Sequence, residues 1–299
     1  MSIYSQITAN KVKTWLIITL FIAFISTIAF VFGKASGYGL SYVGIAFLFS
    51  GIISFFSYYY SDQFILAVSG AKPIEKKDNP QLYNTVENLC IGDGVPLPKI
   101  YIMNEQAPNA FATGRNPSHA VVCVTQGLLN RLDHAELEGV IAHELSHVKN
   151  YDTRLMSIVV ILVGVVALLA DMFLRSMWFS GGRRSSRDEG NGQSIFLLIG
   201  IVLAILSPII ATLIQLAVSR KRELLADASG ALLTRYPEGL ASALEKIARD
   251  PTPLYAANNA TAHLYIMNPF KGKDQKNWFS GLFDTHPPIE ERIKILRSM

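Results

Sequence analysis

The sequence predicts a multi-pass α-helical membrane protein with four spans and an α+β domain built from two polar segments. Half of its residues are hydrophobic, 17% are charged, and its mean hydropathy is +0.29. A soluble domain usually carries about 25% charged residues, so the composition favours a membrane protein. The other two observations are four long apolar runs and a strand-and-helix pattern in the polar sequence between and after them.

Each apolar run approaches or exceeds the about 20 residues that a spanning helix needs. The runs are Trp15–Phe32, Tyr38–Tyr60, Leu155–Leu174 and Ile195–Val218. The first run follows Lys11 and Lys13 as a signal peptide would, but its apolar core exceeds the roughly 7–15 residues of a signal. We therefore interpret it as a retained anchor. Pro208 is expected to bend the fourth helix.

The runs divide the chain into four parts. Residues 1–60 hold two N-terminal transmembrane helices, 61–154 the first polar segment, 155–218 a transmembrane hairpin and 219–299 the second polar segment. In the first segment, "PKIYIMN" and "HAVVCVT" predict strands, and Asp133 with Glu136 predicts a helix start. In the second, "SRKRELLADASGALLTRY" predicts a helix, and another is expected from Ile289.

Charge gives an orientation for the spans. With the N-terminus inside, eleven lysines and arginines near span ends lie on the inner side and five on the outer side. The positive-inside rule then predicts that both polar segments are cytoplasmic, although the third loop, with Arg183–Arg187, disagrees.

A net charge of +4 without a basic stripe gives no reason to expect that the protein binds nucleic acid. Cys90 and Cys123 lack disulfide or metal-ligand spacing.

The stretch "HELSH" is a candidate metal site. His143 and His147 are four residues apart, so on a helix they share a face and can bind one ion at about 2.0–2.1 Å. Glu144 lies beside them, where a carboxylate can accept a proton from metal-bound water. A solvated helix face is the competing interpretation. It is disfavoured because Leu137, Ile141, Leu145 and Val148 bury the other side of the helix.

A catalytic zinc needs a third protein ligand, and Glu223 is the best candidate. Asp227 follows one turn later, where a carboxylate can orient a ligating histidine. Alternatively, the two acids form a solvated face paired with Arg220 and Arg222. The predicted hairpin favours the role of Glu223 as a ligand. His147 precedes the third span and Glu223 follows the fourth, so both residues lie at the same face of the membrane. Three histidines have no partner at ligand spacing: His119, His134 and His263.

Five motifs together resemble one family. "HELSH", "RKRELLADASGA", "PNAFATGR", "NATAHLYIMNP" and "LFDTHPPIEERI" are similar to motifs of the HtpX-type membrane zinc metalloproteases of bacteria, relatives of the CaaX prenyl-protease zinc enzymes. The resemblance covers nearly the whole chain. It implies a zincin-like catalytic domain in two parts, 61–154 and 219–299, with one Zn²⁺ per chain. It also implies His143, His147 and Glu223 as ligands and Glu144 as general base.

The resemblance implies further roles. Asp227 matches a carboxylate behind a zinc ligand, and His286 matches a histidine that stabilises the transition state. Asn109–Gly114 matches an edge strand that pairs with extended substrate, which makes Asn109, Ala110, Phe111 and Ala112 candidate substrate contacts. Family members reside in the bacterial cytoplasmic (inner) membrane with the catalytic domain facing the cytoplasm. They degrade misfolded or damaged membrane proteins, so unfolded or membrane proteins are the expected substrates. No oligomeric state is predicted.

Two other functions compete with this one. A processing peptidase for prenylated or otherwise specific peptides would need a large intramembrane chamber, which four spans hardly provide. A membrane scaffold or holdase with structural zinc would usually close the ion with four ligands, often cysteines. Three ligands with a neighbouring glutamate therefore favour a membrane-bound zinc endopeptidase for protein quality control.

Overall fold

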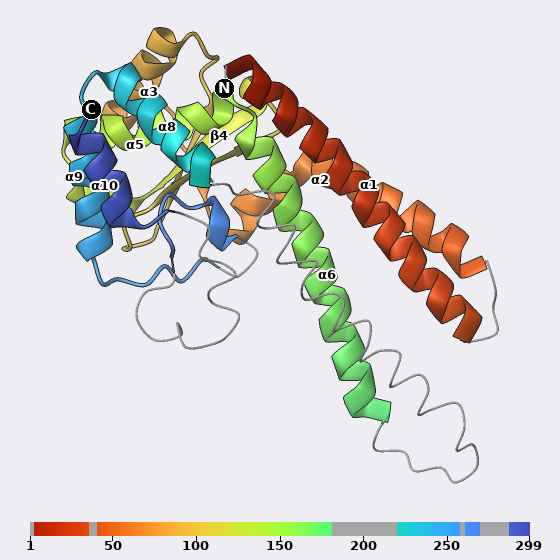
Figure 1. Ribbon diagram of the computed structural model, residues 1–299. Helices are drawn as coiled ribbons and strands as arrows, with labels where there is room; N and C mark the ends of the chain where they lie inside the picture. Colours follow the sequence, from red (N-terminus) through yellow and green to blue (C-terminus); the bar gives the residue numbers. More distant parts are fainter. Residues whose placement is uncertain (1–2, 36–40, 181–219, 258–260, 270–286) are drawn as a thin grey trace.

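The computed structural model describes residues 3–35, 41–180, 220–257, 261–269 and 287–299. A body of helices and a small sheet carries three long helices that project from it (Figure 1). These are α1 (Ile3–Ala35), α2 (Ser41–Val68) and α6 (Asp152–Ser180). The helices α1 and α6 share an apolar core near the body, in which Ile17 and Phe21 pack with Leu155 and neighbouring residues of α6.

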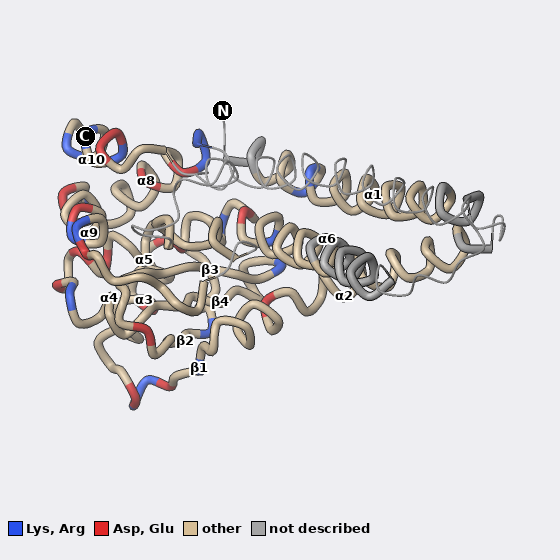
Figure 2. Tube along the Cα trace, turned by 90° about the horizontal axis from the view of Figure 1, so that it is seen from below, with Lys and Arg blue, Asp and Glu red and all other residues tan. Residues whose placement is uncertain are grey.

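Apolar side chains cover the outer surface of the projecting helices. Trp15 is 60% exposed on α1, and Phe47 and Leu48 are 58% and 66% exposed on α2. Surface of this kind and extent is typical of contact with lipid or a partner rather than with water. Lys, Arg, Asp and Glu gather instead on the body (Figure 2). Among the described residues, two stretches are long and apolar enough to span a membrane: Ile7–Phe30 and Val43–Val68.

The expectation of four spans is therefore supported in part. The first two apolar runs correspond to these two stretches. The third run, Leu155–Leu174, lies within the helix α6 but is not one of the two stretches that qualify. The fourth run, Ile195–Val218, and the arginine-bearing loop Arg183–Arg187 lie outside the described residues.

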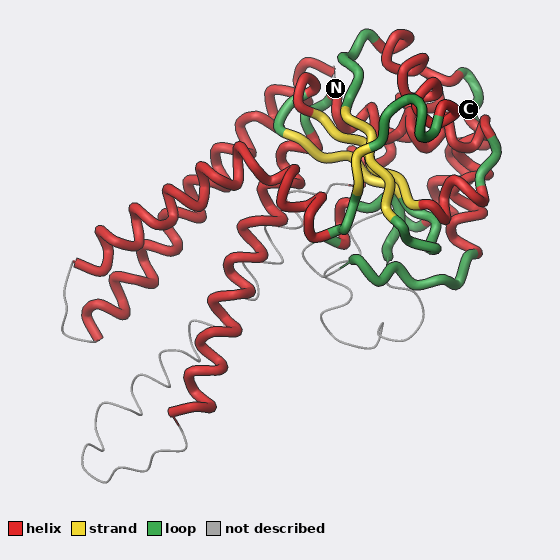
Figure 3. Tube along the Cα trace, turned by 180° about the vertical axis from the view of Figure 1, so that it is seen from behind, coloured by secondary structure: helices red, strands yellow, loops and turns green. Residues whose placement is uncertain are grey.

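Within the described residues, the sheet has four strands in the order β1-β2-β4-β3. They are β1 (Lys72–Pro73), β2 (Lys99–Met103), β3 (Ala110–Gly114) and β4 (Ala120–Thr125). The strands predicted from "PKIYIMN" and "HAVVCVT" are confirmed as β2 and β4, which pair in parallel, while β3 pairs antiparallel with β4 and forms one edge. All six residues of β4 are buried, because one face of the strand packs in a core with α5 and the other in a core with residues of α2 and α6. Figure 3 shows the strands from behind.

The remaining helices surround this sheet. They are α3 (Pro80–Asp93), α4 (Gln126–Arg131), α5 (His134–Lys149), α8 (Arg220–Thr234), α9 (Pro237–Arg249), α10 (Ile289–Arg297) and the short 3₁₀ helices η1 (Pro117–His119) and η2 (Ala262–Leu264). The predicted start of α5 is confirmed: Asp133 caps it and forms a capping box with Glu136. Leu137, Ile141 and Leu145 of its apolar stripe are buried in the core under the sheet.

Glycines let two helices approach α5 closely. A Cβ atom at Gly139 would lie 2.7 Å from the backbone nitrogen of Leu240 on α9. A Cβ atom at Gly230 would lie 3.0 Å from the backbone nitrogen of His143, so α8 packs against α5 with almost no space between the backbones. This close contact brings the second polar segment onto the helix that carries "HELSH".

We expect Gly139→Ala to destabilise the body by about 1–3 kcal/mol, because the added methyl group displaces backbone of α9. Thermal unfolding in detergent measures the effect as a lower Tm. The matched control is Gly92→Ala in α3, where the new Cβ meets only the side chain of Leu233, at 3.5 Å. The control should match or slightly exceed the parent in Tm. Equal Tm values for the two variants would contradict the tight α5–α9 contact.

Candidate metal centre

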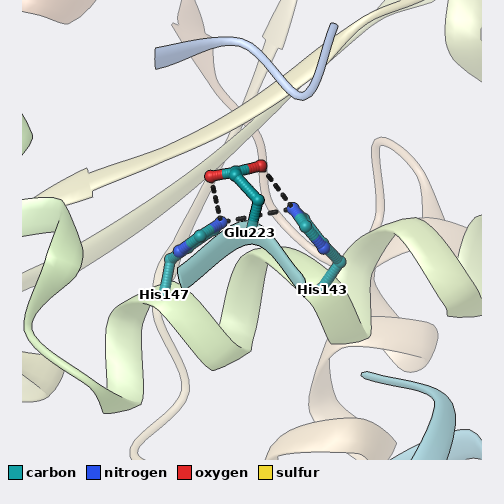
Figure 4. A group of neighbouring side chains, drawn as sticks. All are labelled: His143, His147 and Glu223. Carbon is teal, nitrogen blue, oxygen red and sulfur yellow. Dashed lines mark hydrogen bonds and ion pairs between the residues drawn. The ribbon is translucent and has the colours of Figure 1, made fainter. Parts of the chain in front are cut away.

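Three buried side chains converge between α5 and α8. His143 and His147 come from α5 and Glu223 from the first turn of α8, and their ligand atoms all lie within 4.8 Å of one another (Figure 4). The two histidine Nε2 atoms are 3.2 Å apart. Glu223 places Oε2 3.8 Å from Nε2 of His143 and Oε1 3.5 Å from Nε2 of His147.

These separations fit a tetrahedral metal ion. Ligands about 2.0–2.1 Å from such an ion lie about 3.3 Å from one another. Two imidazole nitrogens and a carboxylate also form a donor set that zinc accepts while one position stays open for water. Glu223 and Asp227 are 3% and 1% exposed, so the alternative of a solvated helix face is wrong for these two residues.

A carboxylate lies behind His143. Oδ1 of Asp227 is 2.9 Å from Nδ1 of His143, on the ring side opposite the cluster. Asp227 is itself held by Arg292 of α10, whose Nε and Nη2 atoms donate to its two oxygens at 2.8 and 2.7 Å. Arg292 is only 1% exposed, and burial of such a charge requires a partner of this kind. The pairing of Asp227 with His143, which the sequence left open, is thus resolved.

A second carboxylate, which the sequence analysis missed, lies behind His147. Oδ2 of Asp152 is 3.0 Å from Nδ1 of His147. On a continuous helix, residues five apart diverge by about 140°, so Asp152 would point away. Instead α5 ends, and Tyr151 takes a left-handed backbone conformation with φ of 60°. The turn brings the first residue of α6 back to the histidine, and no periodicity predicts it.

Glu144 lies beside the cluster and is 2% exposed. Burial raises its pKa to about 7, Glu223 adds to the rise, and the charges of His147 and Arg292 oppose it. Its carboxylate also accepts a hydrogen bond from the backbone N–H of Ala112 on β3. A carboxyl group with a pKa near neutrality is suited to both accepting and returning a proton.

The two histidines differ in their electrostatics. Burial lowers the pKa of His143, more strongly than Asp227 raises it. Burial also lowers the pKa of His147, but Glu223 and Asp152 outweigh it and raise the pKa to about 9. The site therefore carries enough negative charge around His147 to attract a cation.

The edge strand β3 runs past the centre. Asn109, directly before it, donates from Nδ2 to the carbonyl of Met267 at 3.1 Å. The carbonyl of Ala110 accepts from the N–H of Ile266 at 3.0 Å, so part of the strand edge is already paired. Phe111 points its ring into the core, against Tyr265 at a centroid distance of 5.3 Å.

The other histidines stay apart from the centre. His119 and His134 are exposed, and His263 is buried in η2. In the described part of the chain, His143, His147 and Glu223 are the group with metal-site geometry. His286, expected near the reacting atoms, lies outside the described residues. Arg292, six positions further along the chain, lies within the described residues. Its Nη1 atom is 3.9 Å from Oε2 of Glu223.

Known proteins resemble this chain over most of its length. The family model described as Peptidase family M48 matches residues 76–299. A protein named Protease HtpX homolog, from Dictyoglomus thermophilum, is 49% identical over 298 residues, which cover 99% of this chain and 94% of that protein. A protein of the same name from Tropheryma whipplei is 46% identical over 296 residues, with 99% and 98% covered.

A solved structure among those that match shows the similarity in fold. The crystal structure of S. mikatae Ste24p matches with a TM-score of 0.51 and 20% sequence identity, covering 95% of this chain and 67% of that chain. The fold and the site together define a zincin-like metalloprotease attached to a membrane. The chain belongs to peptidase family M48, whose members typically use zinc, and within it to the HtpX-type proteases. The resemblance seen in the sequence is confirmed.

Replacing Arg292 should destabilise the protein strongly. Arg292→Met leaves the buried Asp227 without its cation, and breaking such a pair costs about 3–5 kcal/mol. We expect a much lower Tm in thermal unfolding. Arg297→Met, on the same helix but in an exposed ion pair, should change the Tm little. Adding Asp227→Asn to Arg292→Met should restore part of the loss. A parent-like Tm for Arg292→Met would show that this pair does not stabilise the fold.

Proposed function

We propose that this chain is a membrane-bound zinc endopeptidase that hydrolyses misfolded or damaged membrane proteins. The convergence of His143, His147 and Glu223 beside Glu144 is the observation that carries the proposal. In the proposed mechanism, Glu144 is the general base and Asp227 orients His143. One Zn²⁺ per chain is held by His143, His147 and Glu223. His286 is proposed to stabilise the transition state, on the sequence resemblance alone.

The chain's own residues account for most of the proposed reaction. Bound zinc supplies a Lewis acid and lowers the pKa of its water toward about 7. Glu144 accepts the proton of the attacking water and passes it to the leaving amine, which its raised pKa favours. Asp227 and Asp152 hold the two imidazoles in one tautomer. A donor aimed at the developing oxyanion is worth about 2.7–4 kcal/mol, which is the role proposed for His286.

We propose that substrate adds as an extended strand at the edge of β3. Main-chain hydrogen bonds would give affinity without demanding a substrate sequence. The N–H of Ala112, which bonds to Glu144, marks the part of the strand beside the site. Asn109 and Ala110 continue the proposed contact surface, and substrate would displace their present hydrogen bonds to Met267 and Ile266 there. Phe111 lies in the proposed segment, but its side chain is buried and its backbone groups face β4, because alternate residues of β3 turn their backbone groups toward β4 and toward the free edge.

Four spans are proposed to hold the enzyme in a bacterial cytoplasmic (inner) membrane. Residues 1–60 and 155–218 form the two membrane hairpins, and 61–154 and 219–299 form the two parts of the catalytic domain, facing the cytoplasm. In this orientation, eleven of the lysines and arginines near span ends lie on the cytoplasmic side and five lie on the other side, as the positive-inside rule favours. At the membrane surface, the site meets chain that protrudes from the bilayer, which supports a role in quality control.

Glu144→Gln tests the general base. The substitution keeps the size of the side chain and removes the proton acceptor, so we expect cleavage of unfolded casein and of a loosely folded membrane protein to fall by about 100- to 10,000-fold. Zinc content, measured in the same detergent preparation, should stay at the parent value. Parent-like cleavage would refute the mechanism. Zinc retained in a parent that cleaves neither substrate would favour the scaffold function.

Glu223→Ala tests the ligand set. Loss of one of three protein ligands should lower zinc occupancy, and a chelator should remove the remaining metal faster than from the parent. Elemental analysis of the purified protein measures both. Glu238→Ala is the control, because this exposed glutamate pairs with Arg297 at the surface and should leave zinc unchanged. Unchanged zinc in Glu223→Ala would remove Glu223 from the ligand set.

A further inference from the structure

Asn10 belongs to the first membrane helix, yet its side chain is buried against the metal centre. It is 1% exposed. Its Nδ2 donates to Oδ1 of Asp152 at 2.7 Å and to the carbonyl oxygen of Asn150 at 2.9 Å. The other oxygen of Asp152 is 3.0 Å from Nδ1 of His147. One amide group therefore joins α1 to the carboxylate behind a proposed zinc ligand.

Arg222 completes this contact from a third helix. Its Nη1 donates to Oδ1 of Asp152 at 3.0 Å and to Oδ1 of Asn10 at 3.3 Å. Asn10 thus donates two hydrogen bonds and accepts one, a combination that a carboxylate, a hydroxyl or an alkyl side chain of similar size does not offer. Since Arg222 precedes Glu223, the contact also fixes the start of α8 beside the ligand that α8 supplies.

These contacts define how Asp152 is held. Both donors from outside the site bind Oδ1, and Oδ2 remains for His147. A carboxylate fixed in this way keeps the proton of the imidazole on Nδ1 and the lone pair of Nε2 directed at the metal position. Without Asn10, Asp152 would lose one of its two outer donors in a buried setting, where such a loss is costly.

We propose that Asn10 is a positioning residue for the zinc site and acts through Asp152. The metal centre is then complete only when the first membrane helix is docked against the turn between α5 and α6. The inference rests on the proposed zinc site, and it extends that site into the membrane part of the chain. The rival explanation is that Asn10 merely packs α1 against the body.

Zinc affinity separates these explanations. Asn10→Leu keeps the side-chain size and removes both hydrogen-bonding groups, so competition with a chelator in detergent should show about 10-fold or greater loss of affinity. Cobalt-substituted protein should show altered d–d absorption, because His147 is held differently. The control is Thr14→Val, one turn along α1, where the hydroxyl bonds only within the helix, to the Asn10 carbonyl. It should keep both the affinity and the spectrum.

A double-mutant cycle tests the route through Asp152. If Asn10 acts through it, Asn10→Leu added to Asp152→Asn should lower zinc affinity no further than Asp152→Asn alone. Asn10→Gln, which retains both amide groups, should recover part of the affinity and covers the case in which Asn10→Leu does not fold. Parent-like affinity in Asn10→Leu, additive losses in the cycle, or no recovery with Gln would each overturn the proposal.

Zinc binding by the parent protein distinguishes a failure of this proposal from a failure of the proposed function. A parent that binds no zinc would refute the zinc site itself. A parent that binds zinc, alongside an Asn10→Leu variant that binds it equally well, would refute the role of Asn10 and leave the site intact.

Discussion

The contact between α5 and α8 is the interaction on which the rest of the structure depends. It joins two segments of the chain that lie far apart in sequence, and it buries ionisable side chains from both. Burial of charge is costly unless every group has a partner. The partners come from all sides: Arg292 from α10, Asp152 from α6, Arg222 from α8 and Asn10 from α1. The candidate metal centre is therefore also a buried polar cluster that joins several helices of the protein.

Much of the site could be predicted from the sequence, because helical spacing places residues four apart on one face. That rule brought His143 and His147 together, and the same spacing linked Glu223 to Asp227. The capping box at Asp133 and the strands β2 and β4 follow local patterns as well. The assignment of these residues to catalysis and zinc binding stays a prediction that the experiments above address.

The residues that hold the candidate ligands in place could not be predicted from the sequence, because tertiary contacts bring them together. Asp152 reaches His147 only because Tyr151 leaves the helical conformation. Propensity scales do not predict a tyrosine in the left-handed region, which residues other than glycine seldom adopt. Arg292 and Asn10 act across 65 and 142 positions of the chain, and only tertiary packing brings such pairs together. Of the four predicted membrane spans, the described residues support the first two, and the fourth run lies outside those residues.

The paired carboxylates behind the histidines also have a thermodynamic consequence. Asp227 and Asp152 each face a Nδ1 atom, so each imidazole, when neutral, keeps its proton there and has its lone pair on Nε2, toward the space beside Glu223. At the proposed site, a zinc ion and hydrogen ions would compete for those same lone pairs. Metal uptake therefore displaces protons, and occupancy of the centre falls with acidity. If the proposed zinc site is correct, the metal content of the protein depends on the pH around the site.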